Sequence, residues 1–335
     1  MLQTWNIKLE SKATEISPFF RLASLETFQA TSINISMTPL SYDARRPQTR
    51  DLTALIKRDT GFAAIFHPHT CVYKGNMNDG SATIVVAVKH VLPNGATPAG
   101  WAKLDTRTRR ETVVWMRLNH PNIVELLGTT IDESPQKSTG MVSRWMVNGN
   151  LGTFVTPSLP ITHRQQITCD VAAGLAYLHE QNIMHGDLTA ANVLVDDNGK
   201  ARLVDFGLSS IKAEFEGTSF ISATIGGALR FRALEISPPA EGDYKDFNPE
   251  LTFACDVYSL GSVILQVLSG LQPYHNIPSD VMIALALARK AKPDRPVSTH
   301  LTDAYWEFIQ GCWCDAPDNR PSAAKAHEEL LRLRS

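Results

Sequence analysis

Three polar residues near the middle of the chain have the chemistry to hold a divalent cation. Asp187 and Asn192 lie in residues 185–192, HGDLTAAN, and Asp205 begins the tripeptide DFG. Carboxylate and carboxamide oxygens are hard ligands that Mg²⁺ accepts, above all when phosphate oxygens complete its shell. This stretch therefore offers oxygen ligands of the kind that a Mg²⁺ site needs.

A hairpin would bring these residues together. Asn198-Gly199 is a favoured two-residue turn, and β-prone runs flank it on both sides. Asn192 lies six residues before the turn's first residue and Asp205 six after its second, so an uninterrupted antiparallel ladder would pair them. We expect both side chains at one end of this hairpin, with Asp187 in the loop just ahead and within reach of the same site.

The elements around this stretch divide the chain into differently patterned parts. Residues 1–50 show no sustained period and are predicted to be an N-terminal extension, with a short helix near 19–28. Residues from 51 to about 145 are rich in β-type runs, with Asp79-Gly80 as a hairpin turn. Strands are expected at 71–75, 84–89, 123–127 and 141–145, and one helix at 105–118.

Residues from about 148 to 335 have helical periodicity instead. Thr162 and Gln165 form a capping box, after which Ile167, Val171, Leu175 and Leu178 recur on one helical face. Further helices are expected at 255–269, 279–290, 302–312 and 321–333. The sequence thus predicts an α+β fold of two lobes, a small β-rich N-lobe (51–145) and a larger helical C-lobe (148–335).

Composition limits the partners and the compartment. The 335 residues include 32 basic and 34 acidic ones, so a formal charge of −2 gives no general attraction to nucleic acid or anionic lipid. Charged residues interrupt every apolar run in the first thirty positions, which argues against a membrane span. The five cysteines, an odd number without paired CxxC spacing, favour a reducing compartment. We expect a cytoplasmic protein that binds no nucleic acid.

Several motifs together resemble those of the eukaryotic protein kinases. They are VAVK at 86–89, HGDLTAANVLVD at 185–196, DFG at 205–207, ALE at 233–235 and DVYSLG at 256–261, all in the family's order. The resemblance covers about residues 52–333. It is strongest to the tyrosine-kinase-like serine/threonine branch that mushroom-forming fungi have in many copies. It implies a bilobal kinase fold and transfer of the ATP γ-phosphoryl group to a protein substrate or signalling partner.

The resemblance also implies a role for individual residues. Lys89 would hold the phosphates and pair with Glu111. Asn192 and Asp205 would bind Mg²⁺, and Asp187 would orient the attacking hydroxyl and accept its proton. The site residues expected around the adenine are Val72, Ala87, Leu194, Ser143 and, through their backbone, Arg144 and Met146. Trp115, Leu126, His185 and Phe206 would stack into an apolar column that links the lobes.

The chain departs from the family's pattern in the phosphate-binding loop, in the loop around Asp187 and at Ala228, where serine/threonine kinases have a threonine. The glycine positions of the phosphate-binding loop carry Ile65, His67 and Thr70, although glycine there permits close backbone approach to phosphates. Thr189 replaces the lysine of serine/threonine kinases, and Ala191 stands where tyrosine kinases have arginine.

Three functions remain compatible with these residues. The complete set of Lys89, Glu111, Asp187, Asn192 and Asp205 favours a Mg²⁺- and ATP-dependent protein kinase acting on Ser or Thr. The lost glycines, Thr189 and Ala228 favour a pseudokinase-type binding or scaffold module with weak or no phosphoryl transfer. A small-molecule kinase is disfavoured by the ALE motif and Arg320 of the helical half.

Overall fold

The computed structural model describes residues 49–67, 70–92, 108–109, 111–131, 138–205, 227–238 and 251–335. The chain separates into two compact units, Met1–Arg46 and Pro47–Ser335, and all described residues belong to the second. The predicted N-terminal extension and its short helix therefore lie outside the described residues, apart from Thr49 and Arg50.

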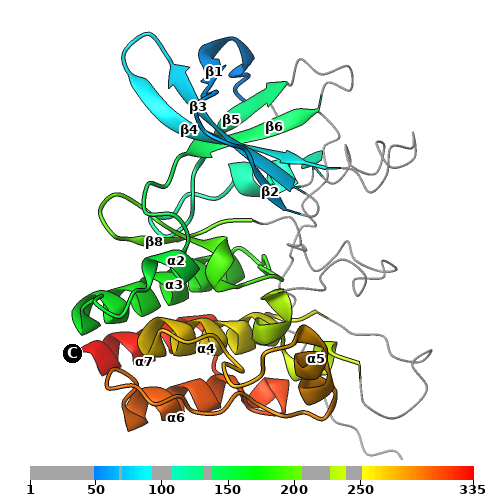
Figure 1. Ribbon diagram of the computed structural model, residues 1–335, viewed down its shortest axis with the longest axis vertical. Coiled ribbons are helices and arrows are strands. Elements are labelled where there is room, and N and C mark those ends of the chain that lie inside the picture. The colour runs from blue at the N-terminus through cyan, green and yellow to red at the C-terminus, as the bar shows by residue number, and fades with distance from the viewer. Residues whose placement is uncertain are drawn as a thin grey trace, which may run out of the picture. The chain divides into compact units, whose positions relative to one another are not determined.

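The first half of this unit is an antiparallel sheet (Figure 1). Its strand order is β1-β3-β4-β6-β5, and β2 pairs with β3. The strands are β1 (Ile56–Arg58), β2 (Ile65–His67), β3 (Thr70–Asn78), β4 (Thr83–Val91), β5 (Leu126–Ile131) and β6 (Thr139–Arg144). The predicted turn at Asp79-Gly80 joins β3 to β4, and Gly80 has a φ of 91° that glycine adopts without strain.

The strand expected at 123–127 begins later than predicted. Residues 123–127 were expected to be extended in the sheet, but β5 begins at Leu126. The preceding backbone bonds to another element, because the Val124 N–H donates to the Leu203 carbonyl and the Leu203 N–H to the Asn122 carbonyl. This segment thereby ties the sheet to the hairpin that carries Asp205.

Alternation along the strands gives the sheet two different faces. Val86 and Val88 of β4 pack with Val142 of β6 and Leu52 in a small buried cluster on one face. The residues between them in β4 face the other way, since successive side chains alternate. That second face includes Met141, which belongs to the large core shared with the helices. The sheet therefore presents one side of β3, β4 and β6 toward the second half.

The strands β2 and β3 form a hairpin where the family has its phosphate-binding loop. Ile65 pairs with Val72 and His67 pairs with Thr70, so two residues, 68 and 69, connect the strands and lie outside the described residues. Ile65 and Phe66 are exposed. The three positions that the family fills with glycine thus belong to a paired hairpin without glycine.

The second half consists mainly of helices (Figure 1). They are α2 (Leu151–Phe154), α3 (Ile161–Glu180), α4 (Phe253–Ser269), α5 (Asp280–Ala288), α6 (Asp303–Cys312) and α7 (Ala323–Arg334). This half also has the short 3-10 turns η2 (Ala190–Asn192), η4 (Gly227–Phe231), η5 (Leu234–Ile236) and η6 (Pro317–Asn319), whereas η1 (Thr53–Leu55) precedes β1 in the sheet half. The sheet half contributes a helix too, at 108–109 and 111–116, within the predicted 105–118.

The apolar faces predicted for these helices form the core. The four residues expected on one face of α3 are fully buried, and α4 is buried along nearly its whole length. Gly270 ends α4 in a left-handed conformation, with a φ of 78°. One core cluster contains α3 and α4 together with Trp115 and Met141 of the sheet half. The expected bilobal α+β fold is confirmed.

The predicted capping box of α3 is wrong. The helix begins at Ile161, one residue before Thr162, and Pro160 occupies the N-cap position without a side-chain hydrogen bond. The Pro160 carbonyl accepts the N–H groups of His163 and Arg164. A proline with its fixed φ thus starts the first turn and leaves Thr162 inside the helix.

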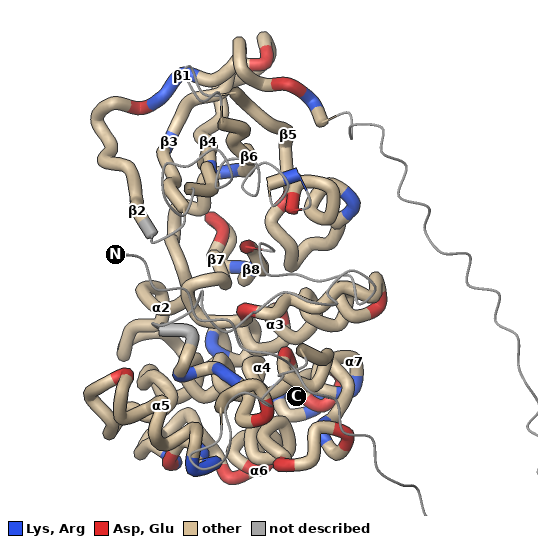
Figure 2. The backbone as a smooth tube through the Cα atoms, turned by 90° about the vertical axis from the view of Figure 1, so that its right-hand side faces the viewer, with Lys and Arg blue, Asp and Glu red and all other residues tan. Residues whose placement is uncertain are grey.

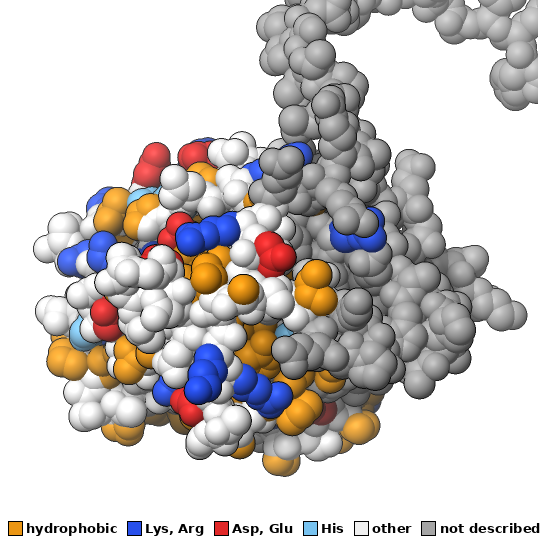
Figure 3. Space-filling view, turned by 90° about the horizontal axis from the view of Figure 1, so that it is seen from above, with side chains coloured by type: hydrophobic (Ala, Val, Ile, Leu, Met, Phe, Trp, Pro, Cys, Tyr) orange, Lys and Arg blue, Asp and Glu red, His pale blue; other side chains and the backbone are white. Residues whose placement is uncertain are grey.

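The surface seen from above shows no face of a single charge (Figure 3). On this side, acidic, basic and hydrophobic side chains are interspersed among the described residues. Among the described helices, none combines the length and the apolar composition needed to cross a bilayer.

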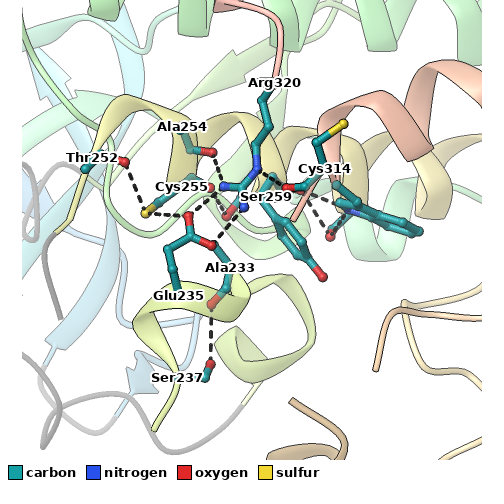
Figure 4. A network of polar contacts seen from close by, with 12 residues as sticks. Ala233, Glu235, Ser237, Thr252, Ala254, Cys255, Ser259, Cys314 and Arg320 are labelled. Atoms are coloured by element: carbon teal, nitrogen blue, oxygen red, sulfur yellow. Dashed lines mark hydrogen bonds and ion pairs between the residues drawn. The ribbon is translucent and has the colours of Figure 1, made fainter. Parts of the chain in front are cut away.

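An ion pair fastens the segment before α4 to the C-terminal part of the chain (Figure 4). Arg320 donates from Nη1 and Nη2 to the two carboxylate oxygens of Glu235, at 2.6 and 2.8 Å. Arg320 also donates to the carbonyls of Ala254 and Cys314, and the Cys255 thiol donates to Glu235. Burial raises the pKa of Glu235, but the bonds from Arg320 outweigh it and hold that pKa below its usual range.

Glu235→Ala is expected to destabilise the protein strongly, because Arg320 is buried and would lose its carboxylate partner. Breaking such a pair costs about 3 kcal/mol of the free energy of unfolding at pH 7, measurable by urea denaturation. The matched control is Glu329→Ala, which removes an exposed ion pair with Arg332 and costs less than about 1 kcal/mol. Because the folded-state pKa of Glu235 is lowered, the difference should shrink as the pH falls below about 4.3. Equal losses in the two variants would contradict this assignment.

Candidate functional site

The β7–β8 hairpin forms around Asn198 and Gly199, but not in the predicted register. Strand β7 (Val193–Val195) pairs with β8 (Ala201–Leu203), and Val193 lies opposite Leu203. The ladder continues to the Asp196 N–H, which donates to the Lys200 carbonyl. Three residues therefore form the loop, and Gly199 takes the left-handed conformation with a φ of 77°. This is a three-residue hairpin loop with a glycine bulge rather than a two-residue turn.

The shift by one residue changes how Asp205 approaches Asn192. The residue opposite Asn192 is Val204, whose N–H donates to the Asn192 carbonyl at 3.0 Å. A one-residue slip would send the Asp205 side chain to the other side of the ladder. Asp205 leaves the ladder instead, because its φ of 69° lies in the left-handed region. Such a conformation is uncommon for a residue other than glycine and often marks a functional site.

Lys89 connects three distant segments at this position. Its Nζ donates to Glu111 Oε1 and to Asp205 Oδ1, each at 2.7 Å. Lys89 comes from β4, Glu111 from the helix at 111–116, and Asp205 follows β8. Figure 2 shows acidic and basic positions close together where β7 and β8 face the sheet. The ammonium and both carboxylates that the sequence singled out thus meet at one point.

The charge of Lys89 is fixed by its two partners. Burial by itself lowers the pKa of a lysine, but the negative charges of Glu111 and Asp205 reverse the effect and raise the pKa of Lys89. Lys89 and Glu111 are buried, whereas Asp205 is partly exposed. The exposed side of this ion-pair cluster is therefore the side on which Asp205 lies.

Asp187 lies against Asn192 and close to Asp205. The Asn192 amide nitrogen donates to the Asp187 carbonyl at 2.8 Å and to its Oδ2 at 3.0 Å. Burial, followed by the negative charge of Asp205, raises the pKa of Asp187 to about 7. A carboxyl group with a pKa near neutrality can act in proton transfer, since its two protonation states have similar free energies.

The loop that carries Asp187 is held by a carboxylate from α4. Asp256 accepts the backbone N–H of His185 at 2.8 Å and that of Gly186 at 2.9 Å. His179, in the last turn of α3, lies 3.0 Å from the same carboxylate. Asp256 is buried and provides these bonds to backbone that precedes Asp187 directly. Asp256 thereby anchors the backbone of the loop that carries Asp187.

The residues expected around the adenine come from both halves. Val72 pairs with Lys89, and Ala87 pairs with Ser143, so these four residues share the sheet face that is turned toward the helical half. Ser143 is buried, and Arg144 ends β6 with an exposed side chain. Met146 and Leu194 pack against the large core, Leu194 from β7. The resemblance implies that the adenine lies between this face of the sheet and Leu194 of β7, and that placement stays a prediction.

The structure describes three of the four residues expected in the apolar column, and the column itself stays a prediction. Trp115 and His185 are buried, and Leu126 packs against the core cluster that contains Trp115. Trp115 Nε1 also donates to the Val124 carbonyl, which belongs to the segment joining the sheet to β8. Phe206 lies outside the described residues.

The residues present fit a nucleotide with Mg²⁺. Asn192 and Asp205 supply an amide and a carboxylate oxygen, which match the ligand preference of that ion. Lys89 adds a positive charge at the same place, and the residues expected on the two sides of the base, Val72 and Ala87 of the sheet and Leu194 of β7, are apolar. The metal ligands and Lys89 suit a polyphosphate, and the apolar side chains suit an aromatic base.

One charged residue near the site was not singled out from the sequence. Arg232 lies between η4 and η5, and its positive charge lowers the pKa of Asp187. Arg232 lies more than forty residues along the chain from Asp187 and outside every motif quoted for the resemblance, so no local pattern pointed to it.

The sequence of the chain is similar to those of known protein kinases. The sequence profile described as "Protein tyrosine and serine/threonine kinase" matches residues 68–330. Serine/threonine/tyrosine-protein kinase HT1 of Arabidopsis thaliana is 28% identical over 328 residues, which cover 96% of this chain and 71% of that protein.

Two further relatives come from the same plant. Serine/threonine-protein kinase CTR1 is 31% identical over 232 residues, 67% of this chain and 26% of that protein. Probable leucine-rich repeat receptor-like protein kinase IMK3 is 33% identical over 208 residues, 60% of this chain and 24% of that protein. The chain thus spans about a quarter of the length of these two relatives.

Asp256→Ala is expected to lower the free energy of unfolding by about 3 kcal/mol. It removes the acceptor of one buried and one partly buried backbone N–H group and of His179, and hydrogen bonds to a charged group are worth about 1.5–3 kcal/mol each before relaxation. Urea denaturation measures the change, and Asp197→Ala, at an exposed position in the β7–β8 loop, is the control with little effect. A loss below about 1 kcal/mol in Asp256→Ala would contradict the anchoring role.

Proposed function

Because the chain belongs to the protein tyrosine and serine/threonine kinase family, we propose that it transfers the γ-phosphoryl group of ATP to a Ser or Thr hydroxyl of a protein. The relatives named above include proteins described as serine/threonine kinases. The substrates and partners of the complete protein belong to this proposal, as does its activity.

The observation that carries the proposal is the meeting of Lys89, Glu111 and Asp205 beside Asp187 and Asn192. These residues come from β4, the helix at 111–116, the loop before η2, η2 and the end of β8. A structural ion pair would need one ammonium and one carboxylate. The two further carboxylates and the Asn192 amide have a role when a metal-bound polyphosphate lies between them.

Each side chain would make a separate contribution to transfer. Lys89 would hold the phosphates and Glu111 would fix its direction. Mg²⁺, held by Asn192 and Asp205, would neutralise charge on the phosphate oxygens. Asp187 would orient the substrate hydroxyl and accept its proton. The hydroxyl oxygen would then bond to the γ-phosphorus while the bond to the bridging oxygen breaks and ADP leaves.

The pseudokinase-type scaffold is the alternative that the missing glycines raise. The β2–β3 hairpin is paired without glycine, and proline at position 68 offers no backbone N–H to a phosphate. The alternative is not favoured, because a scaffold needs none of the five polar groups that the chain retains. Serine/threonine specificity and the tyrosine-kinase-like branch found in mushroom-forming fungi rest on the resemblance of the motifs.

A cytoplasmic location and a role in signal transduction complete the proposal. All five cysteines are free, which suits a reducing compartment. A protein substrate or signalling partner follows from the kinase activity, and the nearly balanced charge gives no reason to expect nucleic acid as a partner.

Mg²⁺-ATP at millimolar concentration is expected to raise the midpoint of thermal unfolding by about 5 °C, since a ligand that binds only the folded state stabilises it. Differential scanning fluorimetry measures the shift. The shift should shrink in EDTA and in Asp205→Asn, which removes the metal-binding carboxylate. An unchanged midpoint at millimolar Mg²⁺-ATP would instead support the scaffold.

Asp187→Asn is expected to lower transfer of radiolabelled phosphate to a generic Ser/Thr protein substrate by about 10³-fold, because the amide cannot accept the hydroxyl proton. The thermal shift by Mg²⁺-ATP should remain in this variant, since Asp187 is not assigned a nucleotide contact. Asp197→Asn, in the exposed β7–β8 loop, serves as the matched control. Transfer that persists at the wild-type rate in Asp187→Asn would remove Asp187 from the mechanism.

A further inference from the structure

Six residues interrupt the edge of the sheet between β1 and β2. Both strands pair with β3, since Arg58 lies opposite Gly75 and Ile65 lies opposite Val72. Residues 59–64 therefore lie opposite only the two residues of β3 between Val72 and Gly75. Extra residues in one strand are frequent next to functional sites, where they redirect a side chain. This segment, the β1–β2 bulge, leads directly into the hairpin that stands where the family has its phosphate-binding loop.

Hydrogen bonds close the β1–β2 bulge into a turn that starts at Asp59. The Asp59 N–H donates to the Lys74 carbonyl at 2.9 Å, which continues the ladder with β3. Asp59 Oδ1 accepts the Gly61 N–H at 3.0 Å, and the Asp59 carbonyl accepts the Phe62 N–H at 3.4 Å. An aspartate that binds backbone two residues ahead stabilises such a turn. The Phe62 side chain thereby starts from a defined place.

Phe62 packs against Trp145, and Lys74 lies over both rings. The ring centroids of Phe62 and Trp145 are 5.1 Å apart, in an edge-to-face arrangement. Lys74 Nζ lies 5.4 Å from the Phe62 centroid and 5.6 Å from the Trp145 centroid, and 4.0 Å from Asp59 Oδ2. Edge-to-face rings attract each other, as do a ring and a cation within about 6 Å of its centroid. Phe62, Lys74 and Trp145 therefore form a cohesive group, the aromatic clamp.

The aromatic clamp shares the sheet face of the residues expected around the adenine. Lys74 pairs with Ala87, which pairs with Ser143, so these three side chains lie on one face. The Trp145 N–H donates to the Val85 carbonyl at 3.0 Å, which extends the pairing of β6 with β4. Alternation along β6 then gives Trp145 the same face as Ser143. The aromatic clamp thus joins the β1–β2 bulge to the chain that leaves β6.

We propose that the aromatic clamp fixes the β1–β2 bulge, and with it β2, against the segment whose backbone at Arg144 and Met146 is expected to bind the adenine. The inference rests on the proposed function. Phe62, Lys74 and Trp145 are positioning residues, because they act through the backbone on either side of the nucleotide. The hairpin has no glycine with which to adapt its backbone to phosphates, so its place would depend on such an anchor. Loss of the aromatic clamp should therefore weaken ATP binding and leave the transfer step nearly unchanged.

The first test compares Phe62→Leu and Lys74→Met with Lys57→Met, which removes an exposed lysine of β1. Phe62→Leu should raise KM for ATP by about 5-fold, in line with the strength of one aromatic pair, with less than about a 2-fold change in kcat. Lys74→Met should act in the same direction, and Lys57→Met should retain the wild-type KM. Phe62→Tyr keeps the ring and should also retain it. An unchanged KM in Phe62→Leu, or a loss of kcat alone, would overturn the proposal.

The second test does not depend on activity. The midpoints of thermal unfolding of Phe62→Leu, Trp145→Leu and the double variant form a mutant cycle. The shift of the double variant should differ from the sum of the single shifts by about 2 °C. The control cycle combines Trp145→Leu with Phe66→Leu, at an exposed phenylalanine of β2, and should be additive.

Additive shifts in the cycle of Phe62 and Trp145 would overturn the aromatic clamp. If the wild-type protein transfers no phosphate, the proposed function fails, and this cycle still decides whether the two rings hold the β1–β2 bulge in place.

Discussion

The contact between Lys89 and the carboxylates of Glu111 and Asp205 is the interaction on which the site depends. It joins a strand of the sheet, a helix beside the sheet and the end of the β7–β8 hairpin through a single buried ammonium. An uncompensated charge in this place would be costly, so each partner requires the others. The same contact brings the groups suited to phosphate and metal to one place.

The rest of the fold keeps this contact in position. The alternation of β4 sends Val86 and Val88 into a small core and leaves Ala87 and Lys89 on the face turned toward the helices. Buried anchors then fix the loops on the other side. Asp256 holds the backbone before Asp187, as the Glu235–Arg320 pair holds the segment before α4. Because these backbone segments are held in place, the side chains that would take part in catalysis have little freedom to move. The site is therefore preorganised for the reaction.

Periodicity predicted the fold class and most helices, because these depend on local patterns. Motif order singled out Lys89, Glu111 and Asp205, whose side chains meet in the structure. Neither predicted the hairpin register, since Asn198-Gly199 fits both a two-residue and a three-residue loop. The start of α3 also differed, because Pro160 replaces a side-chain cap. The sequence did not single out Arg232. Its positive charge lowers the pKa of Asp187 only once distant segments of the chain have packed together. Contacts of this kind need the structure.

The most direct measurement of the central claim is the position of a bound metal. Crystals of the protein with Mn²⁺ and a non-hydrolysable ATP analogue would give an anomalous difference peak for the ion. The account predicts one peak within coordination distance of side-chain oxygens of both Asn192 and Asp205, with Lys89 Nζ on a phosphate oxygen. Nucleotide bound without such a peak, or with the metal away from these two residues, would contradict it.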